Sequence, residues 1–277
     1  MRAAAIQLNS TADVDGNLDA AERLVRAAVG DGAELIVLPE KWSLLAAGEV
    51  MAELAEPLDG RVIESARSWA RELEVHLLAG SVPERVPGRE LLSNTSVMID
   101  PDGKIAAVYR KIHMFDVDVG GVSYRESEFE QAGEEIVLAR AGEIEVGLTV
   151  CYDLRFPELF RILALSGAQA ITVPSAFTAT TGRDHWEVLL RARAIENQLY
   201  VIAANQFGEA PPHYDSWGHS MLIDPWGRVL DIVEAGEGHA IGELALGELD
   251  DVRERVPSLA NRRAGAYRWP EEVTAHA

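Results

Sequence analysis

Short apolar runs alternate with amphipathic stretches along this chain, from its first residues to about residue 256. This alternation is typical of α/β folds, in which helices cover the faces of a sheet. No linker or low-complexity tract interrupts the pattern, and 277 residues are enough to bury a substantial core. We therefore expect residues 1–277 to form a single α/β domain.

The apolar periodicity also predicts where the individual elements lie. Two Asp-Pro-x-Gly segments, at 99–105 and 223–229, are typical of hairpin turns, and their similarity reflects either chance or an ancestral duplication. So many strands with helices between them favour two sheets packed face to face. We expect a loop at 112–135; strands at 2–8, 35–38, 76–80, 95–99, 105–109, 136–140, 144–150, 170–173, 200–204, 219–223, 229–233 and 239–243; and helices at 17–29, 60–73, from Pro157, at 186–197 and at 246–256.

The charge of the chain limits its partners. A formal net charge of -20 argues against nucleic acids, whose binding needs a basic patch, and against anionic membrane surfaces. No apolar run approaches the ~20 residues of a membrane span, and the first residues are too short a run for a signal peptide. With a single cysteine, no disulfide can form within the chain, so we expect a cytoplasmic setting. The acidity reflects either a saline habitat or a high-GC genome.

The single cysteine, Cys151, stands where the apolar run 144–150 ends and a polar segment begins. An unpaired cysteine is often no more than a small buried hydrophobic residue. A thiol at the end of a strand is also a candidate nucleophile.

Two other strand-like runs end in a charged residue. Run 35–38 leads through a proline to Glu40, and run 105–109 leads to Lys111, one of three lysines among 25 basic residues. An ammonium group is a compact charge that fits beside one oxygen, whereas a guanidinium group is a wide fork. Carboxylate, ammonium and thiol together suit acyl transfer, because a base can activate the thiol while a cation stabilises the oxyanion.

Other catalytic arrangements are disfavoured. His185 and His219 lack the spacing of metal ligands, and the glycines near 236–238 do not complete a dinucleotide fingerprint. We expect His113 to be a structural neighbour rather than a base. A papain-like thiol and histidine pair would lack its Cys-Gly-Ser-Cys-Trp segment and would leave Glu40 and Lys111 unexplained. We therefore expect neither a metal site nor a dinucleotide site.

Three motifs in order carry a family resemblance. They are Leu38-Pro-Glu40, Tyr109-Arg-Lys-Ile-His113 and Cys151-Tyr-Asp-Leu-Arg-Phe-Pro-Glu158, and together they resemble the glutamate, lysine and cysteine motifs of the nitrilase, or carbon-nitrogen hydrolase, superfamily. The resemblance implies a four-layer αββα sandwich and a cofactor-free Glu-Lys-Cys site. It also implies homodimers or larger homo-oligomers, and we expect a C-terminal extension at about 257–277, including Trp269, to pack at a subunit boundary.

The residues after the cysteine bear on the substrate. True nitrilases typically carry Cys-Trp-Glu, whereas this chain has Cys-Tyr-Asp, which favours amides. Segments 182–196 and 218–227 resemble the branch that contains deaminated glutathione amidase and omega-amidase. The pair Lys41-Trp42 departs from the family pattern, and a bulky indole beside the base is expected to reshape the pocket.

The resemblance assigns further roles to individual residues. It implies that Glu126 is the second glutamate, which orients the lysine and the substrate, although Glu128 and Glu130 remain alternatives. It also places Thr178 among the substrate-binding residues, and the backbone N–H of Tyr152 beside Lys111 at the oxyanion.

Arg155, four residues after the thiol, can bind a substrate carboxylate through two contacts, or can instead form an ion pair with Asp153 or Glu158.

The expected reaction is hydrolysis of a small carboxylate-bearing amide through a cysteine thioester, with a deaminated glutathione-like substrate. The alternatives are an omega-amidase acting on alpha-ketoglutaramate-type monoamides, an N-carbamoyl amide hydrolase, and a catalytically idle scaffold that keeps the fold.

Overall fold

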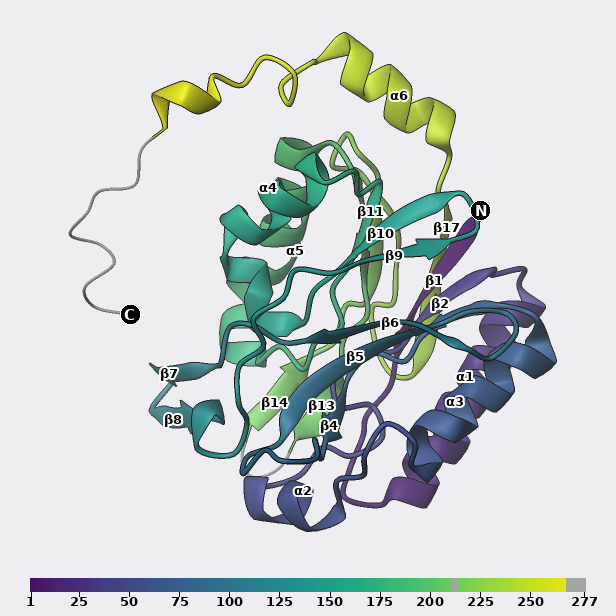
Figure 1. Cartoon of the computed structure of the whole chain (residues 1–277), viewed down its shortest axis with the longest axis vertical. Helices are drawn as coiled ribbons and strands as arrows, with labels where there is room; N and C mark the ends of the chain where they lie inside the picture. Colours follow the sequence, from purple (N-terminus) through teal and green to yellow (C-terminus); the bar gives the residue numbers. More distant parts are fainter. Residues whose placement is uncertain (211–213, 268–277) are drawn as a thin grey trace.

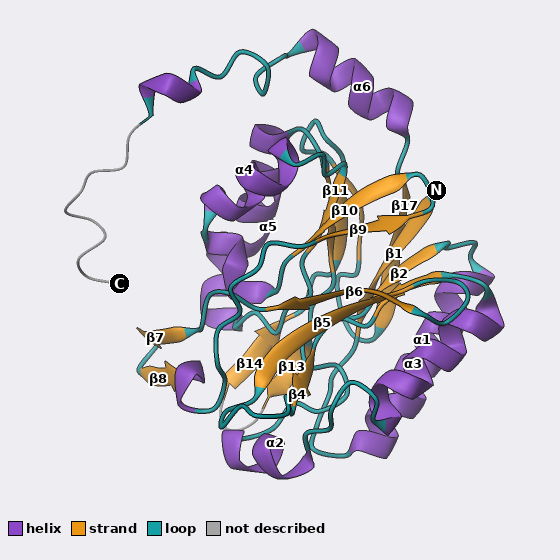
Figure 2. Ribbon diagram, viewed as in Figure 1, coloured by secondary structure: helices purple, strands orange, loops and turns teal. Residues whose placement is uncertain are grey.

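A computed structural model describes residues 1–210 and 214–267 of the chain. In this part of the chain, two mixed sheets pack face to face and helices cover their outer faces (Figure 1, Figure 2). The predicted α/β class and the αββα layer order are confirmed. None of the described helices is both long and apolar enough to cross a bilayer.

The first sheet has seven strands among the described residues: β1 (Arg2–Gln7), β2 (Leu35–Val37), β3 (His76–Leu78), β4 (Val82–Glu84), β5 (Ser93–Ile99), β6 (Ile105–Arg110) and β17 (Gly238–Glu243). Strands β1, β2 and β3 are parallel, and β17 pairs antiparallel with β1. At the other side, β5 pairs antiparallel with β3, β4 and β6. The first and last strands of the sandwich therefore lie side by side.

The second sheet has six strands in the described part of the chain: β9 (Leu138–Ala141), β10 (Ile144–Leu148), β11 (Ala170–Thr172), β12 (Tyr200–Ala203), β15 (Met221–Ile223) and β16 (Val229–Ile232). Its order is β16-β15-β12-β11-β10-β9, with β10, β11 and β12 parallel. Each sheet therefore contains three adjacent parallel strands flanked by antiparallel ones.

Helices cover the two outer faces of the sandwich. Their bounds are α1 (Val14–Gly30), α2 (Gly48–Leu54), α3 (Arg61–Leu73), α4 (Pro157–Leu165), α5 (Ala179–Asn197) and α6 (Leu246–Arg255). The pair α1 and α3 packs on the first sheet, and the pair α4 and α5 packs on the second. Asp13 starts α1 by accepting a hydrogen bond from the backbone N–H of Gly16 at 3.2 Å.

The alternation of side chains along β1 shows how the layers are held together. Ala3 and Ala5 belong to the apolar core between the sheets, whereas Ala4 and Ile6 belong to the core beneath α1 and α3. All four are fully buried, as expected for a strand that is covered on both faces. Small alanine side chains on the inner face allow the two sheets to approach closely.

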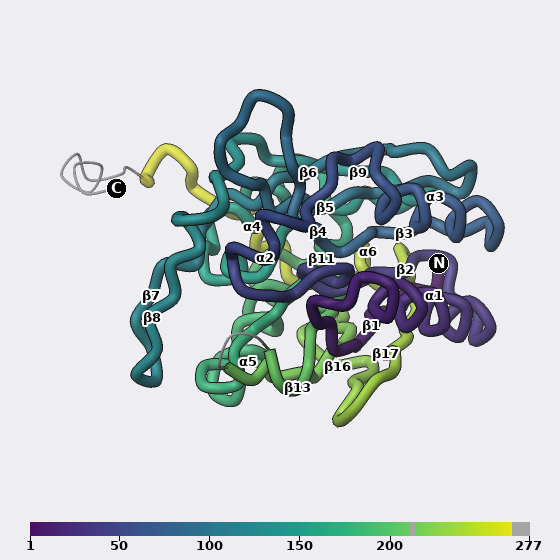
Figure 3. Tube along the Cα trace, turned by 90° about the horizontal axis from the view of Figure 1, so that it is seen from below, coloured from purple at the N-terminus to yellow at the C-terminus, as the bar shows by residue number. Residues whose placement is uncertain are grey.

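Two short hairpins lie outside the sandwich sheets, and one of them corrects a prediction. Residues 112–135, expected as a loop, contain the hairpin of β7 (Asp116–Val119) and β8 (Val122–Arg125), which projects from the body (Figure 1, Figure 3). Gly120 and Gly121 join these strands with φ values of 61° and 78°, a conformation that favours glycine in two-residue hairpin turns. The second hairpin pairs β13 (Phe207–Ala210) with β14 (Tyr214–Trp217).

Both Asp-Pro-x-Gly segments form the predicted hairpin turns. The backbone N–H of Asp100 donates to the carbonyl of Lys104 at 2.9 Å, and that of Asp224 donates to Arg228 at 2.9 Å. One turn joins β5 to β6 and the other joins β15 to β16, so each sheet has the same turn between antiparallel strands.

Helix α6 and the described residues that follow it, up to Tyr267, lie at the outside of the molecule (Figure 1). Helix α6 is attached through Arg253, whose side chain donates to the carbonyls of Gln198 at 3.1 Å and Ala168 at 3.0 Å. The predicted non-helical tail contains one turn of 3₁₀ helix at Ala264–Ala266. Residues 268–277 of the expected extension, Trp269 among them, lie outside the described residues.

Candidate active site

Three strand ends bring the predicted carboxylate, ammonium and thiol into one cavity. Glu40 follows β2, Lys111 follows β6 directly, and Cys151 follows β10, and all three side chains are buried. They line the same cavity of about 550 Å³. The strand-end positions predicted from the sequence therefore converge in space.

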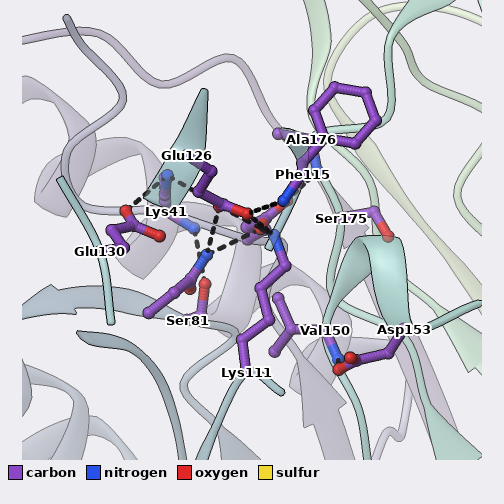
Figure 4. A network of polar contacts seen from close by, with 12 residues as sticks. Lys41, Ser81, Lys111, Phe115, Glu126, Glu130, Val150, Asp153, Ser175 and Ala176 are labelled. Carbon is purple, nitrogen blue, oxygen red and sulfur yellow. Dashed lines mark hydrogen bonds and ion pairs between the residues drawn. The ribbon is translucent and has the colours of Figure 1, made fainter. Parts of the chain in front are cut away.

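Lys111 lies between two carboxylates (Figure 4). Its Nζ is 3.0 Å from Oε1 of Glu40 and 2.6 Å from Oε2 of Glu126. Glu40 is held further by Nδ2 of Asn94 at 2.8 Å and by the backbone N–H of Ala176 at 2.8 Å. The pKa of Lys111 is well above its ordinary value, because these carboxylates outweigh the effect of burial. The lysine is therefore charged and fixed in direction.

Of the three glutamates considered for the second acidic position, only Glu126 contacts Lys111. Glu126 also accepts the backbone N–H of Phe115 at 2.7 Å. Burial disfavours its charged form, but the nearby lysines hold the pKa of Glu126 below its usual range. Glu130 contacts a different lysine, and Glu128 is exposed at the cavity wall.

Cys151 begins a 3₁₀ helix (Cys151–Arg155) with a left-handed φ of 48°, and its backbone N–H donates to the carbonyl of Pro174 at 2.8 Å. Such a conformation is uncommon outside glycine and is often found at functional sites. Burial, and then the charge of Glu40, raise the pKa of the thiol well above its ordinary value, while Lys111 opposes the shift. The resting cysteine is therefore a neutral thiol that needs a base.

Asp153, for which the sequence suggests only an ion pair with Arg155, is a fully buried carboxylate beside the site. It accepts the hydroxyl of Tyr109 at 2.6 Å, the backbone N–H of Val150 at 2.8 Å and the backbone N–H of His113 at 3.2 Å. It therefore ties the turn that carries the thiol to the strand that carries Lys111. The sequence contains a signal for this role. Tyr109 and His113 lie two residues on either side of Lys111, and Asp153 lies two residues after Cys151.

Arg155 lines the cavity with no ion pair to any carboxylate of residues 1–210 and 214–267. The alternative ion pair with Asp153 or Glu158 is therefore wrong. Instead, its guanidinium carbon lies 5.0 Å from the centre of the Phe177 ring, and Nη1 lies 3.2 Å from Nδ1 of His185. The positive charge of Arg155 is therefore available to a ligand in the cavity.

Tyr152 and Thr178, also predicted to bind substrate, line the same cavity. The ring of Tyr152 is 5.1 Å from that of Phe115, so it forms part of an aromatic wall. Thr178 is buried, and its hydroxyl lies 3.0 Å from that of Thr181.

Trp42 lies away from the cavity, so the expectation that its indole reshapes the pocket is wrong. Its Nε1 donates to the carbonyl of Ala79 at 3.1 Å, and its ring packs 5.7 Å from that of Trp69 in the core beneath the helices. The residue that lines the cavity is Lys41. A left-handed φ of 53° at Lys41 breaks the alternation of an extended chain, which turns Trp42 towards the core.

The described residues contain no group of three or more histidine, cysteine, aspartate or glutamate side chains arranged to hold a metal ion. The groups that converge here are those of proton transfer and nucleophilic attack. A buried thiol, a carboxylate and a charged lysine can activate a nucleophile and stabilise an oxyanion.

Fold and site together are those of a nitrilase-type hydrolase. Residues 2–254 match the carbon-nitrogen hydrolase family, and the chain belongs to this family. It is an enzyme that hydrolyses carbon-nitrogen bonds.

Individual relatives span nearly the whole chain. The deaminated glutathione amidase of Synechocystis sp. is 42% identical over 266 residues, covering 94% of this chain and 97% of that protein. The omega-amidase of Danio rerio is 37% identical over 267 residues, covering 96% of each. Among solved structures, the NitFhit protein of C. elegans superposes with a TM-score of 0.89 at 36% identity, and the match covers 96% of this chain and 66% of that one.

Proposed function

We propose that this hydrolase is a thiol amidase that converts a small carboxylate-bearing amide into an acid and ammonia or an amine. The observation that carries the proposal is the convergence of Glu40, Lys111 and Cys151 in one buried cavity. A neutral, buried thiol beside a carboxylate suits a reaction in which the proton leaves sulfur only as the sulfur attacks.

The first half of the reaction forms a thioester. Glu40 accepts the proton of Cys151 while sulfur bonds to the amide carbon, and the carbonyl oxygen becomes negative. Lys111 and the backbone N–H of Tyr152 stabilise this oxyanion. Glu40 then protonates the leaving nitrogen, because an amide anion is too basic to depart unassisted. The carbon-nitrogen bond breaks, and ammonia or an amine leaves.

The second half returns the enzyme to its resting state. Glu40 takes a proton from water as the water oxygen attacks the thioester carbon. The carbon-sulfur bond then breaks, the acid is released, and sulfur regains the proton from Glu40. Glu126 orients Lys111 in both halves through its 2.6 Å contact. Every proton and electron pair comes from these residues, the amide or water, so the steps require no cofactor.

The substrate class follows from Arg155. Its guanidinium group faces the cavity without a carboxylate partner in the described part of the chain, and this group can bind a carboxylate with two hydrogen bonds. Thr178 and Tyr152 line the space beside it. We favour a deaminated glutathione-like substrate, as the name of the Synechocystis relative suggests. The alternatives are an omega-amidase acting on alpha-ketoglutaramate-type monoamides, as for the Danio relative, and an N-carbamoyl amide hydrolase.

Hydrolysis of a panel of amides tests the assignment, measured as ammonia from primary amides and as the released amine from secondary amides. We expect deaminated glutathione to give the highest kcat/KM, and neutral amides of the same length to be poor substrates. A preference for alpha-ketoglutaramate would favour the omega-amidase alternative.

The scaffold alternative predicts a different pattern. It requires that no amide of the panel is hydrolysed, whereas failure of iodoacetamide to reach Cys151 would indicate that the thiol is only a buried hydrophobic group. Labelling with protection would show that the cavity is accessible and binds the amide.

We further propose a homodimer or larger homo-oligomer. The packed helices α4 and α5 carry exposed apolar side chains, namely Ile162, Leu165, Val188 and Ile195. Exposed apolar groups of this kind favour a protein interface. Residues 257–267, the described part of the C-terminal extension, would pack at its boundary. Light scattering of the full chain tests this, and a monomeric mass at micromolar concentration would contradict it.

We also propose that residues 1–277 form one domain, because β1 and β17, near its two ends, pair in one sheet. A free catalytic thiol favours the reducing cytoplasm as its compartment.

A further inference from the structure

A second buried lysine lies in the cavity wall beside the proposed base. Lys41 directly follows Glu40, and its backbone is fixed by a hydrogen bond from its N–H to the hydroxyl of Ser81 at 3.1 Å. Its side chain is 10% exposed, so the ammonium group must be balanced by charges inside the protein. Neither Glu40 nor Cys151 is within its hydrogen-bonding contacts, so the thiol chemistry described above makes no direct use of it.

The carboxylates that balance Lys41 include the one that holds Lys111. Nζ of Lys41 lies 2.7 Å from Oε1 of Glu130 and 3.4 Å from Oε1 of Glu126 (Figure 4). The same Oε1 of Glu126 lies 2.8 Å from Nζ of Lys111. The two ammonium groups therefore share one oxygen of Glu126, one from each side.

Counting charges shows what Lys41 contributes. Two buried carboxylates, Glu40 and Glu130, and the partly exposed carboxylate of Glu126 share two buried ammonium groups, those of Lys41 and Lys111. Without Lys41, the three carboxylates would share one cation, and at least one of them would be driven to take up a proton.

The charge of Glu126 is sensitive to this balance. The pKa of Glu130 is raised to about 7, because burial and the charge of Glu126 outweigh the opposing effect of Lys41. Burial also tends to raise the pKa of Glu126, but the charges of Lys111 and then Lys41 hold this pKa below its usual range. The other titratable groups that act on Lys41 are Glu40, Lys111 and Tyr214.

We propose that Lys41 is a positioning residue for the amidase reaction, whose ammonium group keeps the Glu126 carboxylate ionised and directed at Lys111. Glu130 holds Lys41 in place from the other side. This role rests on the proposed function and extends it to a residue that touches neither the thiol nor the base.

A purely structural lysine would behave differently from a positioning one. If Lys41 only fills space, methionine, which has a similar length, would lower activity by the same factor at every pH. If Lys41 keeps Glu126 ionised, its loss lets Glu126 take up a proton at a higher pH, and activity falls mainly on the acid side. The shape of the pH profile therefore separates the two.

The test compares Lys41→Met, Lys41→Arg, Glu130→Gln and the double variant Lys41→Met with Glu130→Gln, using the full chain and the best amide of the panel. Lys104→Met is the matched control, because Lys104 is an exposed lysine in a surface turn. We expect the acid limb of kcat/KM in Lys41→Met to move up by about one pH unit or more, with about a tenfold loss per unit below it. Arginine at position 41 keeps the limb near its original pH, and the double variant behaves like Lys41→Met, because Glu130 is already neutral on the acid side once Lys41 no longer lowers its pKa.

A second readout does not depend on turnover. The side-chain carboxyl ¹³C resonance of Glu126, identified by its loss in Glu126→Gln, reports the protonation of this group directly. We expect its titration to move to higher pH in Lys41→Met and to stay in place in Lys104→Met. If this shift is seen but no amide of the panel is hydrolysed, the electrostatic role of Lys41 stands and the proposed function fails. An unmoved titration, or a uniform loss of activity at all pH values, would overturn the inference.

Discussion

The ammonium nitrogen of Lys111 lies 3.0 Å from a carboxylate oxygen of Glu40, although 71 residues separate the two in the chain. Both side chains are nearly inaccessible to solvent. A proton acceptor for the thiol and a cation for the oxyanion are therefore already in contact before a substrate arrives. Such preorganisation means that the site needs little rearrangement during the reaction.

The first prediction concerns the effect of Glu40 on the pKa of the Cys151 thiol. Burial and then the charge of Glu40 raise the pKa of Cys151, so Glu40→Gln should lower that pKa and increase the thiolate fraction at pH 8. We expect iodoacetamide to label Cys151 faster in this variant than in the wild type, while ammonia release is lost. Mass spectrometry over time measures the labelling. Exposed Glu143→Gln is the control, and slower labelling of Glu40→Gln would contradict the arrangement.

Lys111→Met should lower kcat by roughly 10²–10³, the usual cost of removing one oxyanion donor. Labelling of Cys151 should also slow, because Lys111 lowers the pKa of the thiol. Lys111→Arg should not restore turnover, since the planar guanidinium does not fit between Glu40 and Glu126. Steady-state kinetics measure kcat for each variant, with Lys104→Met as the control. A loss in kcat of less than about threefold for Lys111→Met would exclude an oxyanion role for this lysine.

Asp153→Asn should destabilise the fold by about 1–3 kcal/mol, because an amide nitrogen would face a donor in place of an acceptor oxygen. The wild-type carboxylate accepts from the Tyr109 hydroxyl and from the backbone N–H of Val150. Urea denaturation followed by circular dichroism measures the change. Exposed Asp102→Asn should have no such effect, and an unchanged midpoint for Asp153→Asn would show that Asp153 is not a structural tie.

Arg155→Met should lower kcat/KM for carboxylate-bearing amides by about 10–100-fold, as expected for a lost hydrogen-bonded charge pair of about 1.5–3 kcal/mol. Neutral amides should be affected much less, because they do not use the guanidinium group. Ammonia release with both substrate types provides the comparison, and exposed Arg140→Met serves as the control. Equal losses of kcat/KM for charged and neutral amides would show that the substrate carboxylate does not bind to Arg155.

Much of the architecture could be predicted because strand ends are visible in the sequence. Each of Glu40, Lys111 and Cys151 directly or closely follows a short apolar run, and parallel strands in one layer present their ends at one edge. The hairpin at 116–125 was missed because its alternating aspartates resemble a polar loop, although Gly120-Gly121 is a hairpin turn signal.

The directions of side chains near the site could not be predicted in the same way. Trp42 was expected in the pocket, but the left-handed φ at Lys41 turns it into the helix-covered core. No periodicity reveals a single residue of positive φ. Likewise, Asp153 meets Tyr109 only because the register of two different sheets brings them together.

Trapping the covalent intermediate tests the central claim most directly. In a single turnover with deaminated glutathione, quenched with acid, peptide mass analysis should find the acyl group on Cys151, formed together with one equivalent of the released dipeptide amine. Cys151→Ser should form no thioester and release no amine on this timescale. Stoichiometric amine release without an adduct on Cys151, or undiminished turnover by the serine variant, would contradict the assignment of Cys151 as the nucleophile.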